Sequence, residues 1–324
     1  MTKAIRIHQT GGPSVMQVET VETRDPGPGE LRIRHAAIGV NFIDTYHRSG
    51  LYPVPLPAGI GLEASGTVDA IGAEVSGFQP GDRVAYGGGP LGAYAEVNIV
   101  PAGRVARLPD AVSFDQAAAI VLKGMTARYL LKETYAVKPG DTILFHAAAG
   151  GVGLLVCQWA RELGATVIGT AGSEEKCALA RSMGATHMIN YSSENVVARV
   201  HEITDGKGVP VVYDGVGKDT FEMSLDCLQP RGLLASFGNA SGPVTGVDLG
   251  ILTQKGSLYV TRPSLAHYTA SEAALAANTA DVFDAVSRGI LTISINQRYG
   301  LDEAVQAHEA LEGRRTTGAS ILVP

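Results

Sequence analysis

Hydrophobic and polar positions alternate in short runs along roughly the first 120 residues, a pattern that predicts β-strands. Residues 31–36 alternate directly after the turn-forming stretch at 25–29 (Asp-Pro-Gly-Pro-Gly). Residues 64–72 and 81–86 are two further short runs with turn residues between them. Short strands at this spacing are typical of a barrel or sandwich-like module, so the first part of the chain is expected to be β-rich.

From Asp141 the pattern changes, and apolar runs alternate with helical periodicity. Residues 142–146 form a continuous apolar run, as in a strand buried on both faces of a parallel sheet. A helix is predicted over 152–163, closed by Gly164. Further strands are expected at 166–169, 187–189, 211–213 and 233–237, and further helices at 174–183 and at 221–228, the latter with Asp219 as N-cap. This series predicts a doubly wound parallel sheet with right-handed crossovers.

After Pro263 the chain returns to a mixed pattern, with helices at 271–288 and 302–311 and a last strand at 320–323. This tail is too small to stand alone, so it is expected to complete the first domain. The predicted organisation is therefore an α/β protein with a β-rich domain at 1–123, completed by 264–324, and a dinucleotide-binding domain at 124–263.

Composition supports a globular protein of two domains: 324 residues, 45% hydrophobic and 18% charged. The formal net charge of −6 disfavours nucleic acid and anionic membranes as partners. Cys157, Cys177 and Cys227 never form a CxxC pair, which argues against a disulfide framework or a cysteine-rich zinc site. The N-terminus lacks an apolar signal segment, and the longest apolar run, 147–157, is too short for a membrane span. A reduced, cytoplasmic protein is the expectation.

The strongest chemical motif is the glycine-containing loop at 148–153, directly after a predicted strand and at the start of a helix. Gly150 would let the backbone approach a pyrophosphate, and Gly153 would let the helix pack closely on its strand. The first glycine of the usual fingerprint is replaced by Ala148. A plain tight turn would explain the loop alone, but the strand–helix series that follows favours a bound dinucleotide.

The end of the second strand of this series indicates which dinucleotide is bound. NAD sites usually carry a carboxylate there for the ribose 2′-hydroxyl, whereas residues 169–173 contain none. Ser173 and Lys176 suit a 2′-phosphate, and Tyr191 would add a phenolic donor. Alternatively, Ser173 is only a helix cap and Lys176 only a solvated side chain, and the neighbouring residues 174–175, both Glu, count against a phosphate. NADPH is the predicted cofactor.

Six segments together resemble one known family: residues 146–153, 41–46, 49–53, 59–66, 236–239 and 260–264. Each resembles the corresponding stretch of zinc-free quinone oxidoreductases, the zeta-crystallin-like branch of the medium-chain dehydrogenase/reductase superfamily. The resemblance spans nearly the whole chain and is closest to bacterial NADPH:quinone reductases.

The resemblance implies a GroES-like β-rich domain, a Rossmann domain and a cleft between them. It also implies a homodimer joined through the strand near residues 257–260. Besides Gly150 and Gly153 of the loop, the NADPH contacts that it implies are Asn41, Tyr46, Tyr129, Gly151, Val152, Gly172, Ser173, Lys176, Tyr191, Val216, Phe237, Gly238 and Arg314.

The same resemblance bears on zinc. Zinc-dependent relatives carry a Cys ligand at the position of Asn41 and a His ligand at that of Leu62. The region of their third ligand, residues 123–126, has neither Cys nor His, and the four-cysteine structural lobe is absent. Without thiolate or imidazole ligands tetrahedral zinc has nothing to hold it, so no metal is expected.

The predicted reaction transfers reducing equivalents from the nicotinamide to a quinone, with a protein donor at the acceptor oxygen. Asn41, Tyr46 and Tyr52 are the catalytic candidates, although Asn41 would equally suit a role in bracing the ribose and Tyr52 a role in packing. Hydride transfer and one-electron transfer are both compatible with the sequence. The alternatives are an NADPH-dependent enone or alkenal double-bond reductase and a non-catalytic, crystallin-like NADPH-binding protein.

Overall fold

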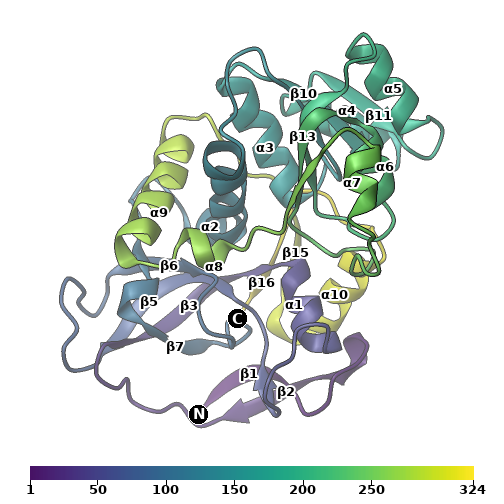
Figure 1. The fold of residues 1–324 in the computed structure, drawn as a ribbon. Coiled ribbons are helices and arrows are strands. Elements are labelled where there is room, and N and C mark those ends of the chain that lie inside the picture. The colour runs from purple at the N-terminus through teal and green to yellow at the C-terminus, as the bar shows by residue number, and fades with distance from the viewer. The chain divides into compact units, whose positions relative to one another are not determined.

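The computed structural model describes residues 1–324, which form two compact units (Figure 1). The N-terminal unit comprises Met1–Met125, Thr269–Gly289 and Ile293–Pro324. The central unit comprises Thr126–Tyr268 and Ile290–Thr292. None of the helices combines the length and apolar character needed to cross a bilayer.

The N-terminal unit contains two sheets. The smaller has the order β2-β1-β4, with β1 (Thr2–Ile7), β2 (Met16–Val21) and β4 (Ala58–Gly59). The larger is seven-stranded, with the order β15-β16-β3-β5-β6-β8 and with β7 paired to β3. Its strands are β3 (Glu30–Val40), β5 (Glu63–Ile71), β6 (Arg83–Gly87), β7 (Val97–Pro101), β8 (Ala106–Arg107), β15 (Ile295–Gly300) and β16 (Ala319–Val323).

The long strand β3 is the centre of this unit because it pairs antiparallel with β5, β7 and β16. The helices are α1 (Phe42–Ser49), α2 (Phe114–Tyr129), α9 (Glu272–Ser287) and α10 (Ala304–Glu312), with short 3₁₀ turns η1 (Pro13–Val15), η2 (Ala102–Arg104) and η4 (Leu301–Glu303). Helix α2 begins in the N-terminal unit and its last residues belong to the central one.

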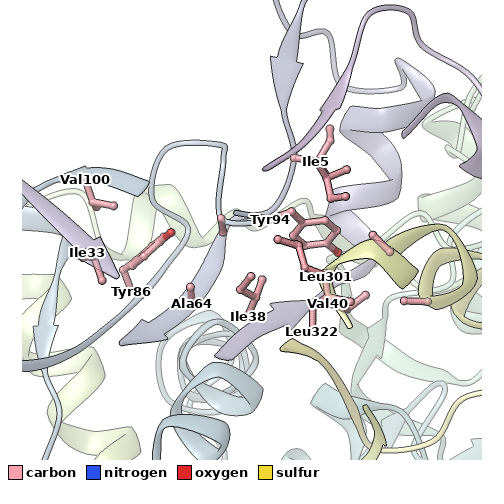
Figure 2. Packing of buried hydrophobic residues seen from close by; sticks show 14 of the residues in the cluster. Ile5, Ile33, Ile38, Val40, Ala64, Tyr86, Tyr94, Val100, Leu301 and Leu322 are labelled. Atoms are coloured by element: carbon pink, nitrogen blue, oxygen red, sulfur yellow. The ribbon is translucent and has the colours of Figure 1, made fainter. Parts of the chain in front are cut away.

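The core of the N-terminal unit joins residues from both ends of the chain. Ile5 and Ile38 share a buried cluster with Leu301 and Leu322 from the C-terminal segment, and Tyr94 lies among them (Figure 2). Burying these side chains contributes about 1.5–3 kcal/mol each, which explains why the C-terminal segment folds with the first strands.

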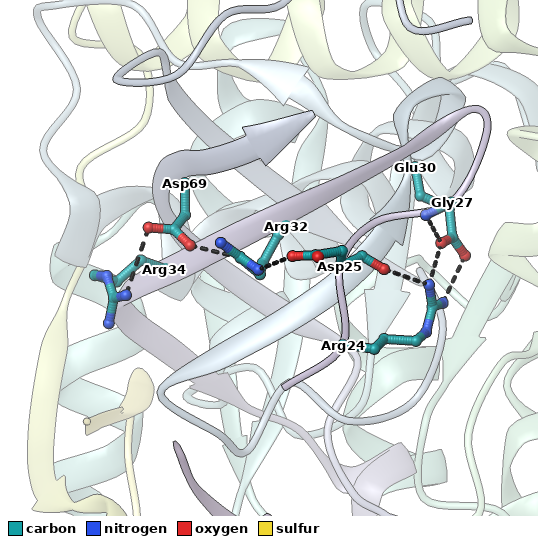
Figure 3. A network of polar contacts seen from close by, with 7 residues as sticks. All are labelled: Arg24, Asp25, Gly27, Glu30, Arg32, Arg34 and Asp69. Atoms are coloured by element: carbon teal, nitrogen blue, oxygen red, sulfur yellow. Dashed lines mark hydrogen bonds and ion pairs between the residues drawn. The ribbon is translucent and has the colours of Figure 1, made fainter. Parts of the chain in front are cut away.

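A row of ion pairs crosses the exposed face of β3 (Figure 3). The Arg32 guanidinium lies 2.6 Å from Asp69 on β5 and 2.9 Å from Asp25. Arg24 binds Glu30 at 2.5 Å, and this contact holds the pKa of Glu30 at about 2. Because these groups are at least partly exposed, each pair adds little stability; the pairs to Asp25 and Glu30 hold the turn before β3.

The central unit is built on one six-stranded parallel sheet with the order β11-β10-β9-β12-β13-β14. Its strands are β9 (Thr142–Phe145), β10 (Thr166–Ala171), β11 (His187–Asn190), β12 (Val209–Asp214), β13 (Leu228–Ser236) and β14 (Tyr259–Thr261). Its helices are α3 (Gly151–Glu162), α4 (Glu174–Ser182), α5 (Val196–Ile203), α6 (Phe221–Asp226), α7 (Gly250–Gln254) and α8 (Leu265–Tyr268), with a π-turn η3 (Leu130–Thr134).

This strand order confirms the predicted α/β fold class. It is that of a doubly wound dinucleotide-binding sheet, in which the order reverses between β9 and β12. The three cysteines are free and buried. In sheets of this kind ligands bind outside the carboxyl ends of the strands at the reversal point.

Two local predictions are wrong. Helix α6 is capped by Thr220 rather than Asp219, and it ends at Asp226 because Leu228 already begins β13. The helix does begin at Phe221 as predicted, but the Thr220 hydroxyl donates to the Asp214 carboxylate at 2.7 Å, which places the cap one residue later than expected.

Candidate functional site

The glycine loop lies where β9 gives way to α3, at the point where the strand order reverses. Gly150 is the N-cap of α3, and Gly151, Val152 and Gly153 form its first turn. A Cβ on Gly153 would lie 2.6 Å from the carbonyl oxygens of both Ala147 and Ala148. Only glycine lets α3 pack this close to the loop, and the first N–H groups of a helix are able to bind an anion.

A second loop follows β12 and is fixed by the buried carboxylate of Asp214. One carboxylate oxygen accepts the backbone N–H groups of Val216 at 2.8 Å and Gly217 at 3.0 Å. The other accepts the hydroxyls of Thr220 and Ser224 at 2.7 and 3.0 Å. Four donors on one carboxylate leave the Val216 loop little freedom.

The two loops are linked through His146, the residue after β9. Its Nε2 lies 3.0 Å from the Ser224 hydroxyl and its Nδ1 lies 3.0 Å from the Thr170 hydroxyl on β10. Burial lowers the pKa of His146, so the imidazole acts as a neutral hydrogen-bonding link. The chain Thr170–His146–Ser224–Asp214 therefore ties the carboxyl ends of three adjacent strands together.

Phe237 and Gly238 follow β13 and lie against the same edge of the sheet. The backbone N–H of Phe237 donates to the Asp214 carbonyl at 2.8 Å. A Cβ on Gly238 would lie 2.3 Å from the carbonyl oxygen of Gly215, so the two loops pack backbone to backbone. The structure thus brings Val216, Phe237 and Gly238 together.

The predicted 2′-phosphate residues gather after β10 and β11. Ser173 is the N-cap of α4 and its hydroxyl accepts the Lys176 backbone N–H at 3.3 Å. The hydroxyl of Tyr191 would lie 2.6 Å from a Cβ on Gly172, so the phenol rests against this turn. Gly172, Ser173, Lys176 and Tyr191 therefore form one cluster.

The two glutamates beside this cluster have different partners. Glu174 accepts the Asn190 amide at 3.0 Å. Glu175 accepts the Ser173 hydroxyl, a hydrogen bond that lowers the pKa of Glu175. A phosphate would compete with Glu175 for that hydroxyl, which is the feature of the cluster least suited to an anion.

Tyr129 and Arg314, like the α1 residues described below, are predicted cofactor residues that lie outside these loop clusters. Tyr129, at the end of α2, is buried and stacks on Tyr268 with ring centroids 4.3 Å apart; burial raises its pKa. Arg314 follows α10 in the N-terminal unit, is exposed, and has a backbone φ of +55°.

The three catalytic candidates lie at or near α1. Tyr46 and Tyr52 meet edge to face with ring centroids 5.2 Å apart, and the Tyr52 N–H donates to the Tyr46 carbonyl. Asn41 caps α1, and its side-chain amide donates to the carboxylate of Glu63 at 2.8 Å. One N–H of the Asn41 amide is therefore committed to Glu63.

Sequence reasoning missed the acidic residues around Asn41. The Asp44 carboxylate accepts the backbone N–H of Asn41 at 2.8 Å and the hydroxyl of Tyr94 at 3.0 Å. Burial raises the pKa of Asp44 to about 7. The sequence did carry one signal for Asp44: an acidic residue three positions after a helix N-cap is typical of a capping box.

The residues at the positions of the zinc ligands do not form a metal site. Leu62 stands beside Glu63, and no group of three or more His, Cys, Asp or Glu side chains is placed to hold a metal ion.

The chain matches two family descriptions that together cover most of its length. Residues 27–110 match the alcohol dehydrogenase GroES-like domain, and residues 151–276 match the zinc-binding dehydrogenase family. The first includes α1 and Asn41, and the second includes Gly151 to Gly153 of the glycine loop and the cluster of Gly172, Ser173, Lys176 and Tyr191.

Individual proteins are similar over their full length. A quinone oxidoreductase of Pseudomonas aeruginosa is 57% identical, with 100% of both chains covered. The crystal structure of Escherichia coli quinone oxidoreductase complexed with NADPH superimposes with a TM-score of 0.98 at 52% identity, covering 99% of this chain and 100% of that one. A 2-haloacrylate reductase of Burkholderia is 47% identical, with 100% of this chain and 99% of that protein covered.

Proposed function

We propose that this chain, which belongs to the quinone oxidoreductase family of the medium-chain dehydrogenase/reductase superfamily, is an enzyme that reduces quinones with NADPH. The observation that carries the proposal is the set of loops at the reversal point of the parallel sheet. There the amino end of α3, the Val216 loop and the Phe237–Gly238 segment meet the carboxyl ends of β9, β12 and β13.

The residues of the central unit fit NADPH. The N–H groups of Gly151, Val152 and Gly153 would bind the pyrophosphate at the positive end of α3. Ser173, Lys176 and Tyr191 would hold the 2′-phosphate with hydroxyl and cationic donors. The relative from Escherichia coli was crystallised with NADPH, which supports the same cofactor here.

When bound, NADPH supplies the reducing equivalents, and the side chains supply binding, orientation and hydrogen bonds. Asn41, Tyr46 and Tyr52 would bind the acceptor or the nicotinamide ribose, with the phenols donating toward the oxygen on which charge develops. We propose that this chemistry is independent of zinc, because Asn41 and Leu62 stand where a thiolate and an imidazole would be needed.

A second candidate is the reduction of an electron-poor carbon–carbon double bond. The 2-haloacrylate reductase that is 47% identical supports it, since that protein shares the whole length of this chain. Such a reaction would use the same nicotinamide site and a different acceptor pocket.

We also propose a cytoplasmic homodimer. The edge strand β14 exposes Tyr259 at 61% and Val260 at 42% of their surfaces. An unpaired edge with exposed apolar side chains favours antiparallel pairing with a second copy, which would join the two six-stranded sheets. Three buried, unpaired thiols suit a reducing compartment.

Steady-state NADPH oxidation tests the proposal. Purified protein is assayed with 1,2- and 1,4-quinones, with 2-alkenals and with 2-haloacrylate at equal concentrations. Turnover highest with a quinone supports the main proposal, and turnover confined to the alkenes or haloacrylate favours the second candidate. Binding of NADPH without turnover on any acceptor would indicate a non-catalytic protein and contradict both.

A further inference from the structure

A buried ion pair joins strand β5 to helix α2 in the N-terminal unit. The Glu63 side chain is fully buried, and Lys123 is 6% exposed. The Lys123 ammonium lies 2.9 Å from Oε2 of Glu63. Desolvating two charges is costly, so a buried pair is weak support for a purely stabilising role.

The same carboxylate oxygen also holds Asn41. The Asn41 amide donates to Oε2 of Glu63 at 2.8 Å, so the amide and the ammonium converge on one atom. The other oxygen, Oε1, accepts the backbone N–H of Leu122 at 2.7 Å. Both oxygens of Glu63 are therefore fixed by α2, and the orientation of the Asn41 amide follows from that of the carboxylate.

The neighbouring strand is shaped to admit this carboxylate. Gly39 on β3 lies two residues before Asn41, and a Cβ there would lie 2.1 Å from Oε2 of Glu63 and 2.3 Å from the Ala118 carbonyl oxygen. Any larger residue would displace Glu63 or α2. Glycine at position 39 therefore leaves the space in which the side chains of Glu63, Lys123 and Asn41 meet.

A second buried carboxyl group, that of Asp44, also binds Asn41 and lies within range of the Lys123 charge. Asp44 has one oxygen bound to the Asn41 backbone N–H and Tyr94, while its other oxygen is buried without a partner. The positive charge of Lys123 acts on Asp44 and lowers its pKa, against the larger effect of burial. Lys123 therefore acts on both of the carboxyl groups that bind Asn41, those of Glu63 and Asp44.

We propose that Lys123 and Glu63 are positioning residues: their buried ion pair fixes the side-chain amide of Asn41 in the orientation that the reaction requires. The inference rests on the proposed function, because it assigns a purpose to the orientation of Asn41. Neither Lys123 nor Glu63 needs to contact the acceptor. Their effect is transmitted through the amide that Glu63 holds.

The test compares Lys123→Met, Lys123→Arg and the double variant Glu63→Gln/Lys123→Met with the wild type. Arg288→Met is the matched control, because Arg288 pairs with Asp284 on the exposed face of α9. We expect Lys123→Met to lower kcat with a saturating quinone about tenfold or more, and to raise the Kd for NADPH by a smaller factor. Lys123→Arg keeps the charge and should recover part of kcat, and the control should match the wild type.

The double variant separates positioning from stability. Lys123→Met leaves the Glu63 charge buried without its cation, so the thermal midpoint of that single variant should fall. The double variant removes both charges, so its thermal midpoint should lie closer to the wild-type value. Its kcat should stay low, because the neutral amide of Gln holds Asn41 less firmly than the carboxylate does. Recovery of kcat together with the midpoint would show that the pair serves stability alone and would overturn the inference.

A crystal structure of Lys123→Met gives a readout that does not depend on turnover. The inference expects the Asn41 amide to leave Glu63, and an amide still within hydrogen-bond distance of Oε2 would overturn it. If the wild type reduces no quinone, the proposed function fails, and this structure still decides whether the pair positions Asn41.

Discussion

Replacing Gly153 by alanine tests the packing that places the amino end of α3. The new Cβ would lie 2.6 Å from two backbone carbonyl oxygens, whereas ordinary contacts begin at 3.4 Å. Helix α3 or the loop must therefore move by about 0.8 Å, because backbone oxygens cannot rotate away. Such overpacking costs about 1–3 kcal/mol, and the better helix propensity of alanine returns up to about 1 kcal/mol.

The same movement displaces the N–H groups proposed to bind the pyrophosphate. Weakening two charge-assisted hydrogen bonds by about 1 kcal/mol each would raise the Kd for NADPH roughly 30-fold. Calorimetric titration with NADPH and denaturant unfolding measure the two effects. Gly12→Ala is the control, since a Cβ at Gly12 has nothing within 4 Å and its φ of −69° suits alanine. Wild-type affinity and stability in Gly153→Ala would refute the reasoning.

Three further predictions concern other parts of the molecule. The double change Ser173→Ala/Lys176→Ala should weaken NADPH binding about 10- to 100-fold and leave NADH nearly unchanged in titrations, and equal losses would refute the 2′-phosphate assignment. The raised pKa of Asp44 favours its protonated form in the fold, so its stabilising contribution is complete below about pH 4 and is lost as the pH rises through about 7. Urea unfolding should therefore show the wild type losing up to about 4 kcal/mol relative to Asp44→Asn between pH 4 and 8, and a constant difference would count against it. The double change Tyr259→Asp/Val260→Asp should convert the proposed dimer to monomers in sedimentation velocity, whereas unchanged sedimentation would place the interface elsewhere.

The sheet of the central unit could be predicted because its signals are local. A continuous apolar run before the glycine loop and Gly164 at a helix end mark β9 and α3 to within one residue. Periodicity identifies such elements without knowledge of the rest of the chain. The N-cap of α6 was misassigned because it depends on Asp214, which binds the Thr220 hydroxyl from another element.

The polar network around Asn41 could not be predicted from the sequence, because it too depends on contacts between residues of different elements. Glu63, Lys123 and Asn41 come from β5, α2 and the end of β3, and their sequence separations of 22 and 60 residues leave no periodic signal. A lysine in an apolar helix reads as a solvated side chain until its partner is known. The roles of Asn41, Tyr46 and Tyr52 in catalysis remain predictions.

Turnover by metal-free protein tests the central claim most directly. The protein is dialysed against EDTA, its zinc content is measured by mass spectrometry, and NADPH oxidation with the preferred quinone is followed before and after zinc is added. The account predicts full activity without zinc and no increase on its addition. Activity that disappears with the metal and returns with one equivalent of zinc would contradict it.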